Sequence, residues 1–134
     1  MHESSIALSI LQSLEGITSR KPNTRVKWIK LKIGRLRMID EDSLKFALEV
    51  FSKGTRAEGM DVKIEWEDPL LKCNSCGYEW SANPKKNDLN SAHLYPDLLL
   101  QLQLFTCPSC GSTNYTIKAG RSLQISEVAL YSEG

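Results

Sequence analysis

The four cysteines of the chain form its strongest chemical pattern. They lie in two short motifs of the same form, Cys73-Asn74-Ser75-Cys76-Gly77 and Cys107-Pro108-Ser109-Cys110-Gly111. In such a turn the two thiolates converge on one metal ion, and the glycine supplies a backbone conformation that lets amides approach the sulfur. Together the two motifs predict a closed, tetrahedral site for structural zinc, whose ligands are Cys73, Cys76, Cys107 and Cys110.

Three other uses of these cysteines fit the sequence less well than structural zinc. Disulfides would close loops of only two residues and would stabilise little. A thioredoxin-like redox site needs one Cys-x-x-Cys at a strand-to-helix junction, whereas both motifs here are flanked by strand-like residues. A zinc deaminase needs His-x-Glu ahead of Pro-Cys-x-x-Cys. Here His2 and Glu3 are adjacent, Pro108 lies inside its motif, and four thiolates would leave no position for water.

The first three residues, Met1-His2-Glu3, form a second candidate metal site. The Met1 amine, the His2 amide and the His2 imidazole can close two chelate rings on one ion, and the Glu3 amide can supply a fourth nitrogen. A square-planar set of nitrogens suits Ni(II) or Cu(II) and suits zinc poorly. If these residues begin a helix, their amides have no intrahelical acceptor and can bind a metal without breaking a helix bond. The alternative is a terminal histidine that only contacts solvent.

Composition and charge exclude several classes of protein. The chain has 134 residues with 41% hydrophobic and 25% charged residues, which is ordinary for a globular protein. Its net charge of +1 lacks the basic excess of a nucleic-acid binder. It shows neither a membrane-spanning run nor a signal peptide, so we expect a cytoplasmic protein without a membrane partner. We do not expect an enzyme, because no catalytic triad, phosphate-binding glycine loop or Walker lysine is present.

Two helices and a small sheet are expected to position these sites. Apolar residues recur at helical spacing from Ala7 to Ile17 and from Leu44 to Phe51. Asp40, Glu41 and Asp42 should cap the second helix, and Gly54 should end it. Alternating apolar residues predict strands at 29–33 and 62–66 and a last strand within 121–131, whose alternation slips near Ser126 and Glu127 as at a β-bulge.

The last strand determines the expected domain organisation. A two-stranded hairpin could not bury both helices, so residues 121–131 should return as a third strand. The prediction is an α+β fold, with two helices on a three-stranded sheet formed by residues 1–68 and 120–134. Residues 69–119 would form an inserted zinc-ribbon-like domain. Thirty residues separate Cys76 from Cys107, more than the usual spacing of about 15–20, so a further segment is inserted between the two zinc turns.

Several motifs together carry a family resemblance. They are Met1-His2-Glu3, Gly34-x-Leu36, Asp40 ahead of Leu44-Lys45-Phe46-Ala47-Leu48, Gly54-Thr55 and the paired Cys-x-x-Cys turns. In this combination the chain resembles, over nearly its whole length, the HypA/HybF family of [NiFe]-hydrogenase maturation. The resemblance implies a non-catalytic nickel metallochaperone with His2 as the essential nickel ligand and a separate structural zinc domain. It implies two partners, a HypB-like maturation GTPase and the hydrogenase large subunit that receives the nickel.

Two positions depart from many relatives. Arg35 stands where many have a polar or acidic residue, so the turn beside the expected partner surface should differ. The long insert, as in archaeal members, holds His93-Leu94-Tyr95-Pro96, which resembles a pattern whose histidine is an additional nickel ligand; the alternative is an exposed loop histidine. A zinc-ribbon module for protein interaction or nucleic-acid binding is the alternative function, and it leaves Met1-His2-Glu3 unexplained. Both a monomer and a homodimer are compatible with the sequence.

Overall fold

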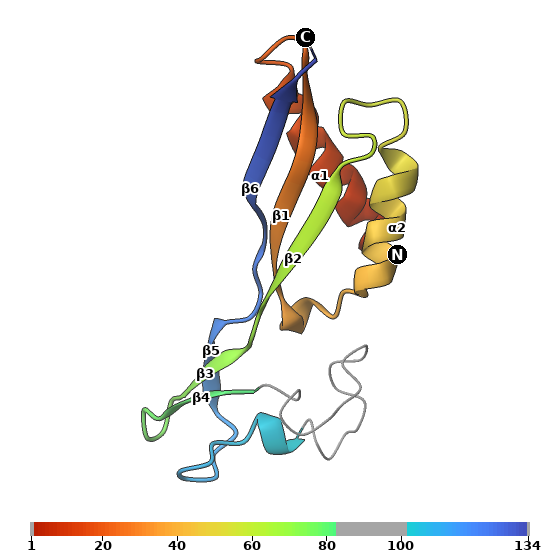
Figure 1. Cartoon of the computed structure of the whole chain (residues 1–134). Coiled ribbons are helices and arrows are strands. Elements are labelled where there is room, and N and C mark those ends of the chain that lie inside the picture. Colours follow the sequence, from red (N-terminus) through yellow and green to blue (C-terminus); the bar gives the residue numbers. More distant parts are fainter. Residues whose placement is uncertain (1, 83–101, 134) are drawn as a thin grey trace. The chain divides into compact units, whose positions relative to one another are not determined.

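The computed structural model describes residues 2–82 and 102–133 (Figure 1). The strands of this part form two three-stranded sheets, with the orders β2-β1-β6 and β4-β3-β5. The elements, in chain order, are α1 (His2–Thr18), β1 (Thr24–Gly34), the 3-10 helix η1 (Arg35–Arg37), α2 (Glu41–Phe51), β2 (Asp61–Glu67), β3 (Leu70–Cys73), β4 (Glu79–Ser81), β5 (Tyr115–Ala119) and β6 (Leu123–Ser132). The predicted α+β fold, with two helices on a three-stranded sheet, is confirmed. Within the described ranges, no helix has both the length and the apolar character needed to cross a membrane.

The two helices pack against each other and cover one face of the β2-β1-β6 sheet (Figure 1). The predicted helical stripes supply most of their core residues, because residues three and four apart share one helix face. Central strand β1 supplies the facing side chains. The buried residues of these three elements are Ala7, Ile10, Leu14, Val26, Ile29, Leu31, Ile33, Leu44, Ala47 and Leu48. Each large side chain among them contributes about 1.5–3 kcal/mol by leaving water.

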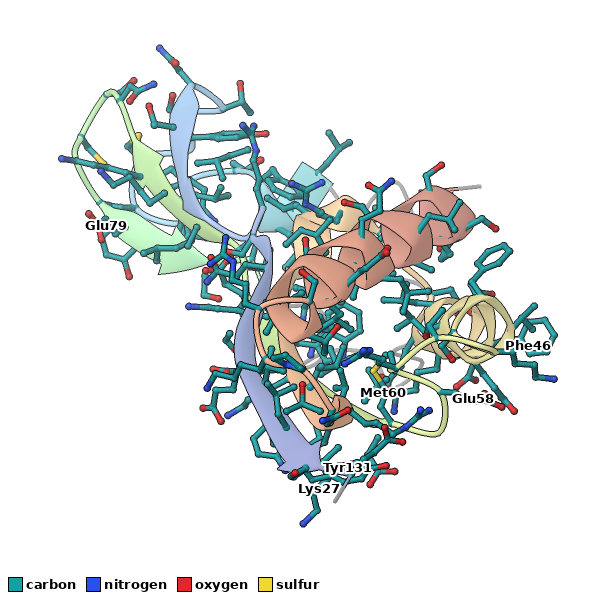
Figure 2. All side chains as sticks on the ribbon, turned by 90° about the horizontal axis from the view of Figure 1, so that it is seen from above. Lys27, Phe46, Glu58, Met60, Glu79 and Tyr131 are labelled. Atoms are coloured by element: carbon teal, nitrogen blue, oxygen red, sulfur yellow. The ribbon has the colours of Figure 1, made fainter. Side chains whose placement is uncertain are left out.

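The capping of α2 follows its sequence. Asp40 has extended backbone angles, and its carboxylate accepts a hydrogen bond from the Ser43 N–H at 2.9 Å. The helix ends at Phe51, and Gly54 follows with a φ of +82° in the turn beyond. The structure therefore confirms the predicted start of the helix, whereas its end is capped at Ser52, two residues before the predicted Gly54. Phe46 projects from this helix on its outer side (Figure 2), with 66% of its surface exposed.

Strand β6 supplies the predicted third strand of the first sheet. Partly covered and exposed side chains alternate from Leu123 to Ser126, but Glu127 is exposed like Ser126 before it, and the next three residues are all partly covered. The predicted slip in alternation therefore occurs at Ser126 and Glu127. The Ser126 hydroxyl donates a hydrogen bond to the carbonyl of Lys30 at 3.2 Å, which fixes β6 beside β1.

The second sheet is built on β3, which pairs antiparallel with both β4 and β5. The register places Cys73 opposite Tyr115. The Trp80 indole N–H donates to the carbonyl of Leu104 at 2.8 Å, and the Trp80 and Tyr115 rings meet edge to face with centroids 6.3 Å apart. Leu71 is fully buried, so this small sheet has an apolar centre of its own.

Two backbone segments cross closely at Gly34 and Gly120. A Cβ atom on Gly34 would lie only 2.0 Å from the carbonyl oxygen of Gly120. The Gly34 N–H donates to the Ser122 carbonyl at 2.7 Å, and the Leu36 N–H donates to the Gly120 carbonyl at 3.0 Å. The Glu67 carboxylate accepts from the N–H groups of Gly120 and Ser122 at 2.9 and 3.2 Å. Only a residue without a side chain fits at position 34.

The chain folds into two compact units. One contains Met1–Lys32, Ile39–Glu65 and Gln124–Gly134, and the other contains Ile33–Met38 and Trp66–Leu123. The two candidate metal sites therefore belong to different units. The division into domains at 1–68 with 120–134, and at 69–119, stays a prediction.

Candidate metal centres

Both cysteine motifs form the same tight turn. The Gly77 N–H donates to the carbonyl of Cys73, and the Gly111 N–H donates to the carbonyl of Cys107, each at 2.9 Å. The two glycines have φ angles of +83° and +80°, which residues with a side chain rarely adopt. The glycine after each motif therefore has the role that the sequence predicted.

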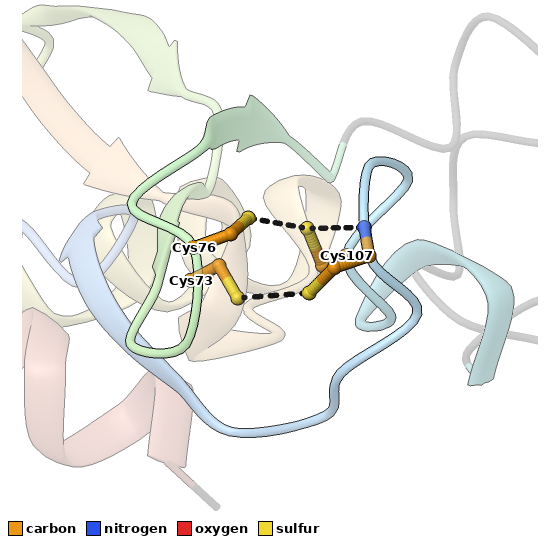
Figure 3. A group of neighbouring side chains, drawn as sticks. Cys73, Cys76 and Cys107 are labelled. Atoms are coloured by element: carbon orange, nitrogen blue, oxygen red, sulfur yellow. Dashed lines mark hydrogen bonds between the residues drawn. The ribbon is translucent and has the colours of Figure 1, made fainter.

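The strand pairing brings the two turns together. Cys73 is the last residue of β3, and it lies opposite Tyr115 at the start of β5. The second turn, which ends with Cys110, lies shortly before β5 in the chain. Because β3 and β5 pair at this end, the segments that carry the two turns leave the sheet side by side (Figure 3).

The spacing of the sulfur atoms fits zinc. All four Sγ atoms lie within 4.8 Å of one another. The distance is 3.6 Å between the Sγ atoms of Cys73 and Cys110 and 3.7 Å between those of Cys76 and Cys107 (Figure 3). A tetrahedron with zinc–sulfur bonds of about 2.3 Å has edges of about 3.8 Å, whereas a disulfide needs about 2.05 Å. The four-cysteine site is thus consistent with structural zinc and not with two disulfides.

Backbone N–H groups favour the thiolate form of Cys73. The N–H of Cys76 is the main cause that lowers the pKa of the Cys73 thiol to about 6, although burial opposes it. The N–H of Ser112 lowers the pKa of Cys110, but the neighbouring Cys73 sulfur and burial outweigh it and raise that pKa to about 12. A divalent cation at this site would favour the deprotonated form of all four thiols, and binding it would release their remaining protons.

The cluster is suited to hold a metal and not to activate water. Cys73 and Cys107 are buried, whereas Cys76 and Cys110 are exposed. Among residues 2–82 and 102–133, no histidine or carboxylate joins the four sulfurs. Four thiolates complete a tetrahedral zinc shell, so the metal would have no open position for a substrate.

Glu3 connects the beginning of α1 with the beginning of α2. Helix α1 begins at His2, and the Glu3 carboxylate accepts a hydrogen bond from the Asp40 N–H at 3.0 Å. Sequence reasoning used Asp40 as a helix cap and as part of a family motif, and it missed this contact. The two residues are 37 positions apart, and no local pattern pairs them. The contact fixes the first turn of α1, whose amides have no intrahelical acceptor.

Three predicted nickel ligands cannot be placed in the same way. Met1 and His93 lie outside the described residues, as does the side chain of His2. Their binding of nickel stays a prediction.

Arg35 is held inside its own unit. Its Nε donates to the Asp68 carboxylate at 2.8 Å, and its guanidinium lies 5.4 Å from the centroid of the Trp66 ring. Only 10% of the Arg35 side chain is exposed. Because most of the side chain is covered by these contacts, Arg35 stabilises its own unit. Its expected effect on a partner surface stays a prediction.

Comparison with known proteins points to one family. Residues 1–130 match the family described as hydrogenase/urease nickel incorporation, metallochaperone, HypA. The hydrogenase maturation factor HypA of Pyrococcus furiosus is 32% identical over 139 residues, which covers 100% of this chain and 99% of that protein. The hydrogenase maturation factor HypA of Methanopyrus kandleri is 33% identical over 132 residues, which covers 97% and 93% of the two chains.

Two solved structures have the same fold. The solution structure of the Ni metallochaperone HypA from Helicobacter pylori covers 98% of this chain and 98% of its own, with a TM-score of 0.59 and 17% identity. A second solution structure, of HypA protein, covers 98% of this chain and 97% of its own, with a TM-score of 0.64 and 19% identity. At these identities the likeness concerns the fold alone.

Proposed function

Because the chain belongs to the HypA family of nickel-incorporation metallochaperones, we propose that it binds Ni(II) at Met1, His2 and Glu3 and releases it to a client hydrogenase. The match over residues 1–130 is the observation that carries this proposal. The chain is a non-catalytic nickel metallochaperone of [NiFe]-hydrogenase maturation. Its chemistry is therefore the capture, holding and release of one cargo ion.

The proposed nickel ligands are four nitrogen atoms at the start of α1. They are the Met1 amine, the His2 and Glu3 amides and the His2 imidazole, and this planar set suits Ni(II). Two features of the described residues support the assignment. Helix α1 begins at His2, so these amides belong to its first turn and lack intrahelical acceptors. The positive end of the helix dipole disfavours an ammonium group there, which eases loss of the amine proton.

Glu3 supports the site in a second way. Its carboxylate accepts a hydrogen bond from the Asp40 N–H, so the Glu3 side chain is held while its backbone amide would bind nickel. A fixed first turn loses less conformational freedom when the metal binds. Nickel should therefore bind a turn that is already ordered on its C-terminal side.

The zinc site is proposed separately. Cys73, Cys76, Cys107 and Cys110 would hold one Zn²⁺ ion as four thiolates, as their spacing allows. When bound, zinc supplies folding energy and not chemistry. The chain's own part is to present deprotonated sulfurs, and the backbone N–H groups around Cys73 favour that form.

His93 is proposed as an additional nickel ligand. It is the only histidine besides His2 in the chain, and its motif resembles that of archaeal relatives with long inserts. With His93 bound in place of the Glu3 amide, the nickel shell would contain two imidazoles and would keep four planar nitrogens. Without it, the nitrogens at the start of α1 would form the whole shell.

Partners and location follow from the same premise. A HypB-like GTPase would assist nickel transfer, and the large subunit of a [NiFe]-hydrogenase would receive the ion. We place the chain in the cytoplasm because four thiols kept as metal ligands need a reducing compartment. The inserted domain, residues 69–119, would be the zinc domain, and residues 1–68 with 120–134 would be the nickel domain.

Blocking the amine tests the proposal. A Gly-Ser extension ahead of Met1 converts the amine into an amide, while every side chain stays in place. Nickel titration with zinc counted separately should show one nickel per untagged chain, loss of the planar complex in the extended chain and equal zinc in both. Equal nickel affinity in both chains would contradict the proposal and would favour a zinc-ribbon adaptor.

A further inference from the structure

The two zinc turns have the same internal hydrogen bond but differ in the residues that can make contacts between them. Both have the same glycine and the same backbone hydrogen bond that closes the turn. The residue after the first cysteine is Asn74 in one turn and Pro108 in the other. Proline has no N–H and no polar side chain, so only the first turn can reach across to the second at this position.

Asn74 makes three hydrogen bonds to the segment that follows the second turn. Its N–H donates to the Asn114 carbonyl at 2.9 Å. Its side-chain Nδ2 donates to the Asn114 Oδ1 at 2.9 Å, and its Oδ1 accepts from the Thr116 hydroxyl at 2.9 Å. Cys73 already pairs with Tyr115 in the sheet. Asn74 therefore extends the pairing of β3 and β5 by one residue toward the sulfur atoms.

A pair of serines forms a second link between the turns. The Ser75 and Ser112 hydroxyl oxygens lie 3.1 Å apart, and the Ser112 oxygen also accepts from the Asn114 N–H at 3.0 Å. Ser109 occupies the place of Ser75 in the second turn. Its hydroxyl makes no hydrogen bond within the described ranges. The link is therefore specific to one of two matched serines.

These contacts join the two zinc turns to each other, which the hydrogen bonds inside each turn do not do. The bond that closes each turn holds its own two cysteines together, but the distances of 3.6 and 3.7 Å are those between sulfurs of different turns. We propose that Asn74, Ser75, Ser112 and Asn114, named the clasp, are positioning residues that hold the two thiolate pairs at zinc-binding distance. The inference rests on the proposed zinc assignment and is independent of the nickel site.

The clasp should act before zinc arrives. A metal site that must assemble from separated segments loses affinity, because ordering them opposes binding. With the clasp closed, zinc would meet four sulfurs that already lie within 4.8 Å of one another. The exposed Cys76 and Cys110 would then be the side from which zinc enters and leaves.

The test measures zinc retention in the full-length, zinc-loaded protein. A chromophoric chelator competes for zinc, and cobalt substitution reports the tetrahedral thiolate shell. Loss of a residue that supports metal ligands typically costs 10–100-fold in affinity. Asn74→Ala should therefore weaken zinc binding about tenfold and alter the cobalt spectrum. Ser75→Ala should weaken binding, whereas the matched control Ser109→Ala should not.

A second pair of variants separates positioning from folding. Asn114→Leu has a side chain of similar size but removes the acceptor of Asn74 Nδ2, whereas Asn114→Asp retains an acceptor. We expect the leucine variant to lose zinc faster and the aspartate variant to stay close to wild type. Circular dichroism should show an unchanged fold for all zinc-loaded variants.

The outcomes are distinguishable. Zinc affinity and cobalt spectra equal to wild type in Asn74→Ala, or equal losses in Ser75→Ala and Ser109→Ala, would overturn the clasp while the zinc assignment stands. If Asn74→Ala does not fold, indistinguishable zinc loss in the two Asn114 variants overturns it. A wild-type chain that binds no zinc would overturn both proposals.

Discussion

Gly34→Ala is the substitution for which the structure makes the sharpest prediction. Gly34 has a φ of −75° and a ψ of 137°, angles that any residue can adopt. Alanine would therefore bring no backbone strain. Its Cβ, however, would lie 2.0 Å from the oxygen and 2.1 Å from the carbon of Gly120, and Cβ contacts under 3.0 Å essentially do not occur. The clash is with backbone, which cannot rotate away as a side chain can.

The expected loss of stability follows from the contacts at this crossing. To relieve the clash, the segments around Gly34 and Gly120 must separate by about 1 Å, as in an overpacked core, which costs about 1–3 kcal/mol. The bonds from Gly34 N–H to Ser122 and from Leu36 N–H to Gly120 would lengthen with them. Each is worth about 0.5–1.5 kcal/mol. The free energy of unfolding should therefore fall by about 2–6 kcal/mol, a large part of the 5–15 kcal/mol typical of a domain.

Gly16→Ala is the matched control. A Cβ at Gly16 meets nothing within 4 Å, and the position lies inside α1. Alanine is the better helix former there, so this variant should gain about 0.5–1 kcal/mol. Urea denaturation at equal zinc loading, followed by tryptophan fluorescence, measures both changes. If the free energy of unfolding of Gly34→Ala were within about 0.5 kcal/mol of the wild-type value, the close approach of the Gly34 and Gly120 backbones would be refuted.

Three further predictions concern the metal sites. Cys110→Ser removes one of four thiolates, so the chain should lose zinc and residues 66–123 should melt at lower temperature; full zinc content with normal melting would contradict this. Glu3→Ala leaves the Asp40 N–H without its acceptor, a loss of about 1.4 kcal/mol, so nickel should bind about tenfold more weakly. Glu3→Gln retains an acceptor, so its dissociation constant for nickel should stay within about threefold of the wild-type value. Equal dissociation constants for all three proteins in nickel titrations would show that the Glu3–Asp40 contact does not support nickel binding. His93→Ala should reduce the nickel shell from two imidazoles to one in X-ray absorption spectra. One imidazole in both proteins would show that His93 is not a nickel ligand.

Much of the fold could be predicted because its signals are local. Helical spacing of apolar residues, the Asp40 cap and the alternation that slips at Ser126 each depend on neighbours in the chain. The zinc turns are local in the same sense, since each motif contains its own glycine. Strand β1 was predicted only at 29–33 but runs over Thr24–Gly34. The buried positions slip between Val26 and Ile29, which lie three residues apart, and pairing within the sheet extends the strand beyond the regularly alternating part.

The contacts that could not be predicted join distant positions. Glu3 and Asp40 are 37 residues apart, and Asn74 and Asn114 are 40 apart. Asn and Ser are ordinary turn residues, so nothing in the sequence distinguishes Asn74 or Ser75, which bridge the turns, from Ser109, which does not. The need for glycine at position 34 is likewise set by a segment far along the chain and not by its own φ. Such pairings follow from the packed fold and have no local signal.

Nickel titration of the wild-type and His2→Ala proteins tests whether nickel binds at the start of α1. Both proteins keep the free amine, and zinc is counted separately in each. We expect the wild type to bind one nickel per chain as a yellow, diamagnetic, near-planar complex. We expect His2→Ala not to form this complex, and both proteins to retain equal zinc and equal stability. A His2→Ala protein that binds nickel with unchanged affinity and spectrum would contradict the claim that the start of α1 is the nickel site.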